Sequence, residues 1–190
     1  MSWRRMGSSL GVKVREHRLL TLIRSTMSED TPLLVDAAGA RLLGEVHETS
    51  FDRGPADIDD QVRLKVGSHA QVIRMTRVRT QAGVPFMIEA VRMPAELLQG
   101  IGDAELSRSF LTQWALTGGV ELGAAEEVVS AGTASPEACS ALGLEPGAPV
   151  LVLERVINTR RGRPAQWRRA ECHKDRARFQ VRHKHGLATA

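Results

Sequence analysis

One pattern occurs twice in this chain and restricts the folds that the chain can adopt. The segment RVRTQAGVPFMIEA begins at Arg77, and RVINTRRGRPAQWRR begins at Arg155. Each copy reads as a strand, a turn with glycine, and a return strand near a proline. A short helix precedes each copy, with Asp57 and Ser135 as start signals. Two copies are too few for a solenoid, so we expect the two halves of one antiparallel sheet.

The spacing within the two copies favours an α+β fold. Hairpins and connecting helices replace the regular strand–helix–strand alternation of a parallel sheet. The residues before each strand also correspond, and we match Leu64 with Leu144. The sequence therefore predicts a sheet with pseudo-twofold symmetry.

Length and composition exclude several classes of protein. The chain has 190 residues, 42% of them hydrophobic, and no run approaches the roughly 18 apolar residues of a membrane span. No apolar leader follows Arg4 and Arg5, so we expect no signal peptide. The two cysteines form neither a disulfide framework nor a metal-type spacing. We expect a reduced, cytoplasmic protein with no metal or other cofactor.

The net charge of +4 conceals a strong asymmetry. Residues 153–190 hold eleven Lys and Arg against three acidic residues, whereas residues 25–152 hold nine against eighteen. A basic stretch can bind nucleic acid, but tyrosine is absent and Trp167 is the only tryptophan of the stretch. We therefore favour a solvated basic face, partly paired with the acidic middle, over direct DNA binding.

The second copy also carries an ordered set of short motifs. They are LGLEPGAPVLVLERV, a G-x-P turn, and a final D-R-x-x-F supplied by Asp175, Arg176 and Phe179. With AAEEVVSAGTASPEACSALGL and the first copy, this order resembles a UTRA domain over roughly residues 43–183. UTRA domains are the ligand-sensing domains of GntR-type transcription regulators of the HutC subfamily. The resemblance implies a chorismate-lyase-like fold: one antiparallel sheet, helices on one side, and a small-molecule pocket beneath them.

The start of the chain departs from such regulators. Residues 1–42 offer one amphipathic helix, over residues 12–25, and up to two strands, which is too little for a winged helix-turn-helix. We expect residues 1–42 to be a helix and strand extension without a DNA-binding domain. Residues 43–183 then form the UTRA/chorismate-lyase-like domain, and residues 184–190 a frayed tail.

Candidate binding residues come from both copies. Arg77 and Arg79 lie two positions apart on one strand, so both point to one face, where they can hold a carboxylate or phosphate. The resemblance implies that they line the effector pocket with Glu89. It also places Gln166 and Trp167 where the family commonly carries Glu and Tyr. The alternative is that Arg77 and Glu89 form only a cross-strand ion pair.

Other ionisable residues receive structural interpretations. Arg155 is the counterpart of Arg77, and we favour a structural pair with Glu154 or Glu171 over a pocket role. Cys172 is expected to be a buried strand residue.

Two functions remain open at this stage. In the first, which we favour, the chain is a stand-alone UTRA-like domain, dimeric through sheet edges or helices, that binds a small anionic metabolite as effector. In the second, it is a lyase, cyclase or isomerase of a biosynthetic pathway that acts on an anionic substrate, with Glu89 as the proton-transfer candidate. Chorismate lyases carry a carboxylate five residues after the turn proline. Here that position is Arg169, so their ordinary reaction is not expected.

Overall fold

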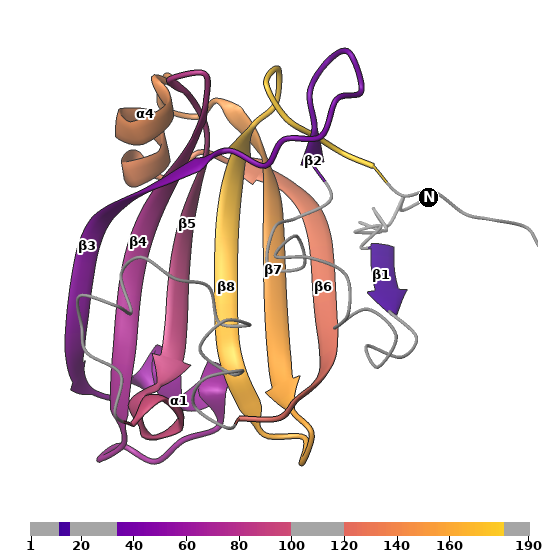
Figure 1. The fold of residues 1–190 in the computed structure, drawn as a ribbon. Helices are drawn as coiled ribbons and strands as arrows, with labels where there is room; N and C mark the ends of the chain where they lie inside the picture. The colour runs from indigo at the N-terminus through magenta and orange to yellow at the C-terminus, as the bar shows by residue number, and fades with distance from the viewer. Residues whose placement is uncertain (1–11, 16–33, 100–119, 181–190) are drawn as a thin grey trace, which may run out of the picture.

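The computed structural model describes residues 12–15, 34–99 and 120–180 of the chain. Seven strands form one sheet in the order β1-β6-β7-β8-β5-β4-β3, with every neighbouring pair antiparallel (Figure 1). These strands are β1 (Val12–Arg15), β3 (Glu45–Pro55), β4 (Gln71–Gln81), β5 (Val84–Pro94), β6 (Leu122–Thr133), β7 (Pro149–Thr159) and β8 (Pro164–His173). Two short strands, β2 (Leu34–Val35) and β9 (Arg178–Phe179), pair separately. The predicted α+β fold with a large antiparallel sheet is confirmed.

The sheet consists of two similar halves that meet where β5 pairs with β8. The first half runs β3, α1 (Ile58–Leu64), β4, β5 and the short 3-10 helix η2 (Ala95–Leu98), and the second runs β6, α4 (Pro136–Leu142), β7 and β8. The helices begin at residues 58 and 136 and the next strands at 71 and 149, which is one constant offset of 78 residues. At that offset Leu64 corresponds to Leu142 and not, as we predicted, to Leu144.

The glycine of each repeat closes a hairpin turn. Gly83 between β4 and β5 has φ +76°, and Gly162 between β7 and β8 has φ +80°. This left-handed backbone conformation is available to glycine without the steric cost that a Cβ atom brings. The repeated G-x-P pattern therefore marks the two turns from which β5 and β8 return across the sheet.

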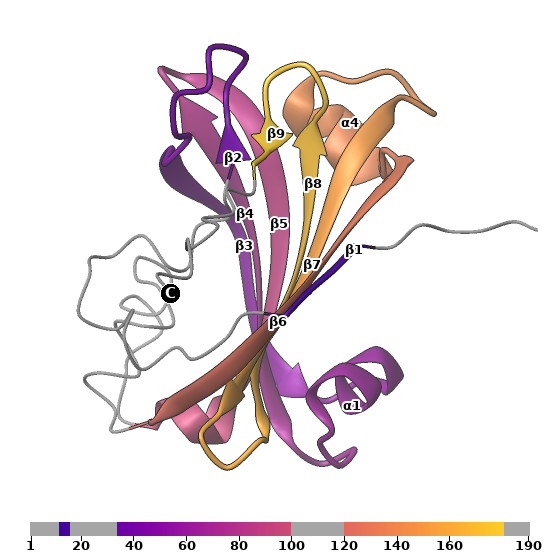
Figure 2. The ribbon, with the colours of Figure 1, turned by 90° about the vertical axis from the view of Figure 1, so that its right-hand side faces the viewer.

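Both described α-helices lie on the same side of the sheet (Figure 2), as the resemblance implied. Helix α1 begins with a capping box in which Asp57 and Asp60 each accept a hydrogen bond from the other's backbone N–H. Asp60 is fully buried and also binds the sheet, accepting hydrogen bonds from Arg92 Nη1 at 2.7 Å and Arg74 Nε at 3.0 Å. This network attaches α1 to β4 and β5.

Trp167 of β8 fills the space beneath α1. It belongs to an apolar cluster with Leu64 and Val72, and the Arg63 guanidinium lies 4.1 Å from the centroid of its ring. Helix α4 covers the opposite end of this face of the sheet. The Ser135 side chain caps α4, and the backbone N–H of Ser135 donates to Glu171 Oε2 at 2.9 Å. Carboxylates of each half therefore anchor the helix of that half.

The opposite side of the sheet carries two apolar clusters. One lies toward the end with η2, and the other lies toward the end with β2 and β9. The buried strand residues of these clusters include Ile73, Met75, Val91, Met93 and Ile157 in the first, and Met87, Leu153, Ala170 and Cys172 in the second. The expectation that Cys172 is buried is confirmed, since its exposed fraction is 0%.

The arginine of the D-R-x-x-F motif has a structural contact. Arg176 Nη1 donates to the backbone oxygens of Pro85, at 2.7 Å, and Leu142, at 3.2 Å. It thereby connects the start of β5 with the end of α4. Phe179 of the same motif packs against the second apolar cluster.

The N-terminal prediction is wrong in part. Residues Val12–Arg15 form β1, which pairs with β6, instead of the first turn of a helix. The remainder of the helix predicted over residues 12–25 lies outside the described residues. Among the helices within the described ranges, none has the length and apolar character needed to cross a membrane.

Candidate functional site

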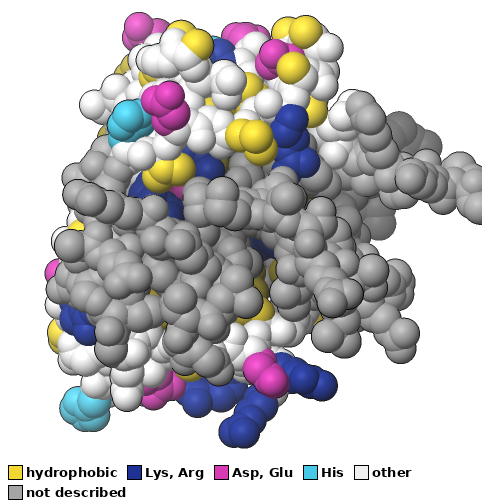
Figure 3. Space-filling model, viewed as in Figure 1, with side chains coloured by type: hydrophobic (Ala, Val, Ile, Leu, Met, Phe, Trp, Pro, Cys, Tyr) yellow, Lys and Arg dark blue, Asp and Glu magenta, His cyan; other side chains and the backbone are white. Residues whose placement is uncertain are grey.

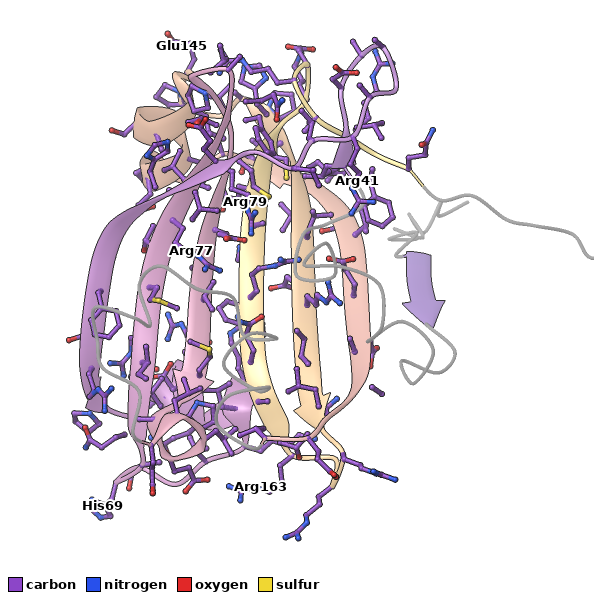
Figure 4. The ribbon with its side chains drawn as sticks, in the orientation of Figure 1. Arg41, His69, Arg77, Arg79, Glu145 and Arg163 are labelled. Atoms are coloured by element: carbon purple, nitrogen blue, oxygen red, sulfur yellow. The ribbon has the colours of Figure 1, made fainter. Side chains whose placement is uncertain are left out.

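A band of charged side chains crosses the middle of the sheet between the two apolar clusters. We call it the charged band, and it contains six residues from five adjacent strands. They are Arg77 and Arg79 of β4, Glu89 of β5, Arg168 of β8, Arg155 of β7 and Glu127 of β6. Arg77 and Arg79 are labelled in Figure 4, where both lie over the upper half of the sheet and Arg79 lies above Arg77.

Strand register explains why these residues share one face. Arg77 is the cross-strand partner of Glu89. In the other half of the sheet, Arg168 of β8 is the cross-strand partner of Arg155 of β7, and Arg155 is the partner of Glu127 of β6. Directly paired residues in a sheet lie on the same face. Between β5 and β8, Glu89 is the partner of Ala170, and Arg168 lies two positions from Ala170 and therefore on the same face. All four arginines are at most 9% exposed.

Glu89 is the central carboxylate of the band. It is fully buried, and its Oε1 lies 3.0 Å from Arg77 Nε and 3.2 Å from Arg79 Nη2. Its Oε2 faces Arg168 Nη1 at 3.7 Å. The cross-strand pair that we considered as the alternative for Arg77 and Glu89 is therefore present, within a larger cluster.

These contacts shift the acidity of the groups involved. Burial alone would raise the pKa of Glu89, but the charges of Arg77, Arg79 and Arg168 outweigh it and lower the pKa to about 2. Burial lowers the pKa of Arg79, and the neighbouring cations Arg77 and Arg168 add to this effect while Glu89 opposes it. The band thus holds an ionised carboxylate among crowded guanidinium groups.

Arg168 connects the two carboxylates of the band. Besides its contact with Glu89, its Nη2 donates to Glu127 Oε1 at 3.2 Å. The Glu127 side chain is 17% exposed, whereas Arg168 is 2% exposed. Glu127 therefore lies at the end of the band nearer to solvent.

Four of the five predicted binding residues lie on this face of the sheet, which is opposite the face that carries α1 and α4. The resemblance implied a pocket beneath the helices, so the side of the sheet expected for these residues is not the one beneath α1 and α4. Gln166 is buried two positions from Arg168 on β8, and its amide donates to Met93 Sδ at 3.7 Å. Trp167 does not join them. Neighbouring strand residues point to opposite faces, so Gln166 and Trp167 cannot line one site, and Trp167 packs under α1 instead. Trp167 therefore lies on the face of the sheet opposite the charged band.

The interpretation of Arg155 also needs correction. We predicted a structural pair with Glu154 or Glu171, but both glutamates belong to the helix-covered face. Glu154 contacts Arg169 at 3.3 Å there, and Glu171 binds the start of α4. Arg155 instead lies opposite Arg168 in the charged band.

Sequence reasoning missed Arg168 and Glu127. Alternation along β8 could have placed Arg168 with Gln166, because the two are two residues apart. The count from the turn proline led to Arg169, which is on the other face. For Glu127, the sequence predicted an extended segment over β6. It did not reveal which strand pairs with β6, so Glu127 could not be placed beside Arg155.

Over the described residues 153–180, the basic C-terminal stretch does not form one continuous surface. Arg155 and Arg168 point into the charged band, Arg169 pairs with Glu154, and Arg176 binds backbone oxygens. Exposed arginines gather at the β7–β8 turn, where Figure 3 shows blue side chains at the lower end of the molecule. Even there, Arg163 forms an ion pair with a glutamate of η2.

Other chemistries find little support within residues 34–99 and 120–180. No group of three or more His, Cys, Asp or Glu in these ranges could hold a metal ion. Cys172 is buried, and burial raises the pKa of its thiol. His47 and His69 are exposed.

Comparison with known proteins gives one consistent result. The ligand-binding domain of a putative GntR-family regulator from Bordetella bronchiseptica has a TM-score of 0.70 and 23% identity, and the match covers 80% of this chain and 97% of that one. A GntR-family regulator from Enterococcus faecalis V583 has a TM-score of 0.68 and 22% identity, with 73% and 100% covered. The effector domain of PhnF from Mycobacterium smegmatis has a TM-score of 0.63 and 22% identity, with 73% and 86% covered. At these identities the three structures show the fold.

Sequence comparison points in the same direction. The HTH-type transcriptional repressor NagR of Bacillus subtilis (strain 168) is 25% identical over 99 residues, which is 52% of this chain and 41% of the repressor. The alignment thus spans less than half of that relative. The family model of the UTRA domain matches residues 45–178, the range that contains the sheet from β3 to β8 and the whole charged band. Since this match covers well over half of the chain, the chain belongs to the UTRA domain family.

Proposed function

We propose that residues 45–178 bind a small anionic metabolite as the effector in a GntR-type system of transcription regulation. The observation that carries this proposal is the charged band, in which four arginines from both halves of the sheet converge on one buried face. The UTRA family match and the likeness to GntR-family regulators support an effector-binding regulatory domain.

The electrostatics of the band favour an anionic ligand. Within the described residues, four guanidinium groups lie beside two carboxylates. The crowding of cations affects Arg79, whose pKa is lowered by burial and by its cationic neighbours. A bound anion would oppose that effect, and paired N–H donors of arginine match the geometry of a carboxylate or phosphate.

The enzyme alternative finds no specific support in the site. A general acid must hold a proton near neutral pH, but the pKa of Glu89 is lowered to about 2 by the surrounding arginines. Arg169, at the position where chorismate lyases carry their carboxylate, is on the opposite face from Glu89. A lyase reaction that uses Glu89 as proton donor is therefore not proposed.

The test is a thermal-shift screen of the purified chain against phosphorylated sugars, sugar acids and short carboxylates, followed by calorimetric titration of every hit. A ligand that binds the folded state raises the melting temperature. We expect Arg77→Met to weaken binding about tenfold or more, and Arg169→Met, a loss of arginine from the other face, to leave it within about twofold. Circular dichroism of each variant would be the control for folding.

The outcomes separate the two functions. Recovery of the hit unchanged, as measured by mass spectrometry, supports an effector. Conversion of the hit into another compound would favour the enzyme. If no anion in the panel binds, or if Arg77→Met and Arg169→Met bind equally well, the proposal is wrong.

Three further expectations from the sequence stay predictions. They are the dimer, the cytoplasmic location, and a region of residues 1–42 without a winged helix-turn-helix. Most of residues 1–42 lie outside the described ranges.

A further inference from the structure

The charged band is asymmetric, although the sheet that carries it is built from two similar halves. In the first half, Arg77 faces the carboxylate Glu89 across the β4–β5 pair. At the equivalent place in the second half, Arg155 faces Arg168 across the β7–β8 pair. The second half therefore brings two cations together where the first half pairs a cation with an anion. Arg155 and Arg168 therefore form a second arginine pair, and Glu89 lies between this pair and Arg79.

Arg168 is held by two carboxylates of different character. Glu89 is fully buried and contacts Arg77 and Arg79 as well, so its charge is compensated from several directions. Glu127 accepts a hydrogen bond from Arg168 Nη2 at 3.2 Å, and its side chain is 17% exposed. Water reaches Glu127 more readily than Glu89, so the Glu127–Arg168 contact is the easier of the two to exchange.

We infer that the ligand carries two anionic groups, the first held by Arg77 and Arg79 and the second by Arg155 and Arg168. Glu127 occupies Arg168 in the absence of ligand, and the second anionic group displaces it. This inference rests on the proposed function, since it names the class of ligand for the same site.

Strand spacing defines the shape of such a ligand. Strands β4 and β7 are separated by β5 and β8, so their backbones lie about 14 Å apart at the usual strand spacing. Long arginine side chains shorten the gap between the guanidinium groups. A short molecule with an anionic group at each end, such as a phosphorylated sugar acid or a dicarboxylate, can reach both pairs across Glu89. An inorganic phosphate or a simple carboxylate can occupy one pair.

Matched ligands test the number of anionic groups. Calorimetric titration would compare 6-phosphogluconate with glucose 6-phosphate and gluconate, and succinate with butyrate, in a buffer without phosphate or carboxylate. Hydrogen bonds to charged groups contribute enough that we expect the two-anion member of at least one set to bind about tenfold more tightly or better than its one-anion counterparts.

Variants test the displacement of Glu127. Glu127→Gln keeps the size of the side chain but removes the competing charge, so the affinity for the two-anion ligand should rise several-fold, by about threefold or more. Arg168→Met should reduce that affinity about tenfold or more and leave a one-anion ligand within about twofold. Arg155→Met provides a second variant of the same arm if Arg168→Met does not fold. Arg169→Met is the matched control, because it changes the next residue of β8 on the opposite face.

Each result has one interpretation. A two-anion preference that Arg168→Met or Arg155→Met removes and Glu127→Gln strengthens supports the inference. One-anion ligands that bind as tightly as two-anion ligands overturn the inference and leave the proposed function intact. Weaker binding by Glu127→Gln overturns the displacement, because it means that Glu127 contacts the ligand directly. If no anion binds to the chain at all, the proposed function fails, and the inference fails with it.

Discussion

Replacing Glu89 with glutamine removes the charge around which three arginines are packed. Glu89 is 0% exposed, and the charges of Arg77, Arg79 and Arg168 lower its pKa from 4.5 to about 2. A pKa shift of this size corresponds to about 3 kcal/mol of stabilisation at neutral pH. Removing one partner of a buried ion pair typically costs a similar amount, about 3–5 kcal/mol. We therefore expect Glu89→Gln to lower the free energy of unfolding by about 3 kcal/mol at pH 7.

The pH dependence of this loss has a defined sign. The pKa of Glu89 is lower in the folded state, so the unfolded chain takes up the proton first as the pH falls. The stabilisation is complete above the unfolded pKa of 4.5 and disappears as the pH falls toward about 2. The difference between the wild type and Glu89→Gln should consequently be constant from about pH 7 to pH 5 and shrink below that range.

Urea denaturation followed by circular dichroism measures both quantities. Glu154→Gln is the matched control: Glu154 contacts Arg169 at 3.3 Å and Arg63 at 3.7 Å on the helix-covered face, and its side chain is 36% exposed. An ion pair with such access to water contributes less than about 1 kcal/mol. The buffer must be free of phosphate and carboxylates, because a bound anion would replace part of the missing charge.

Two results would refute the reasoning. The first is a loss below about 1 kcal/mol for Glu89→Gln at pH 7, equal to that of the control. The second is a difference between wild type and Glu89→Gln that stays the same from about pH 6 to pH 3, because then the stabilisation does not come from the ionised Glu89.

Three further predictions concern the two faces of the sheet. Trp167→Ala should lower the free energy of unfolding by about 3–5 kcal/mol, because the ring packs against Leu64 of α1, while effector affinity in the titration above stays within about twofold. A change in affinity larger than tenfold would mean that Trp167 contributes to effector binding. Asp60→Asn should cost about 3 kcal/mol or more in urea denaturation, since the fully buried Asp60 accepts hydrogen bonds from arginines of β4 and β5; a cost below about 1 kcal/mol would mean that this network does not anchor α1. Iodoacetamide should modify Cys139 in the native protein and spare Cys172, whose thiol is buried and has a raised pKa, as peptide mass spectrometry would reveal. Equal modification of the two cysteines would contradict the burial of Cys172.

Local signals in the sequence were sufficient for most of the fold. The residues that start a helix at Asp57 and Ser135 and the turn glycines Gly83 and Gly162 act within a few positions of themselves, so their effect can be read along the chain. Repetition of these signals then indicated two halves. The exception is Val12–Arg15, where a mixture of apolar and charged residues suggested a helix but pairing with β6 produces a strand. Tertiary pairing often overrides so weak a local preference.

The candidate site was predicted less completely because it depends on pairings between distant strands. Arg77 and Glu89 belong to one hairpin, and a short turn determines their register, so the sequence could bring them together. Arg168 reaches Glu89 only because β8 pairs with β5, and no spacing within either strand specifies that contact.

The consequence of an error of one residue is large in a sheet. A shift of one position moves a side chain from one face to the other, so Arg168 and Arg169 differ completely in environment although they are neighbours. Arg168 is 2% exposed between Glu89 and Glu127, and Arg169 is 39% exposed beside Glu154. Counting from the turn proline selected Arg169 and therefore the wrong face. Once the β5–β8 pairing is known, alternation along β8 assigns Arg168 to the charged band, and the β7–β8 and β6–β7 pairings then add Arg155 and Glu127. The comparison of Arg168→Met with Arg169→Met consequently tests the register of the sheet and the location of the ligand in one experiment.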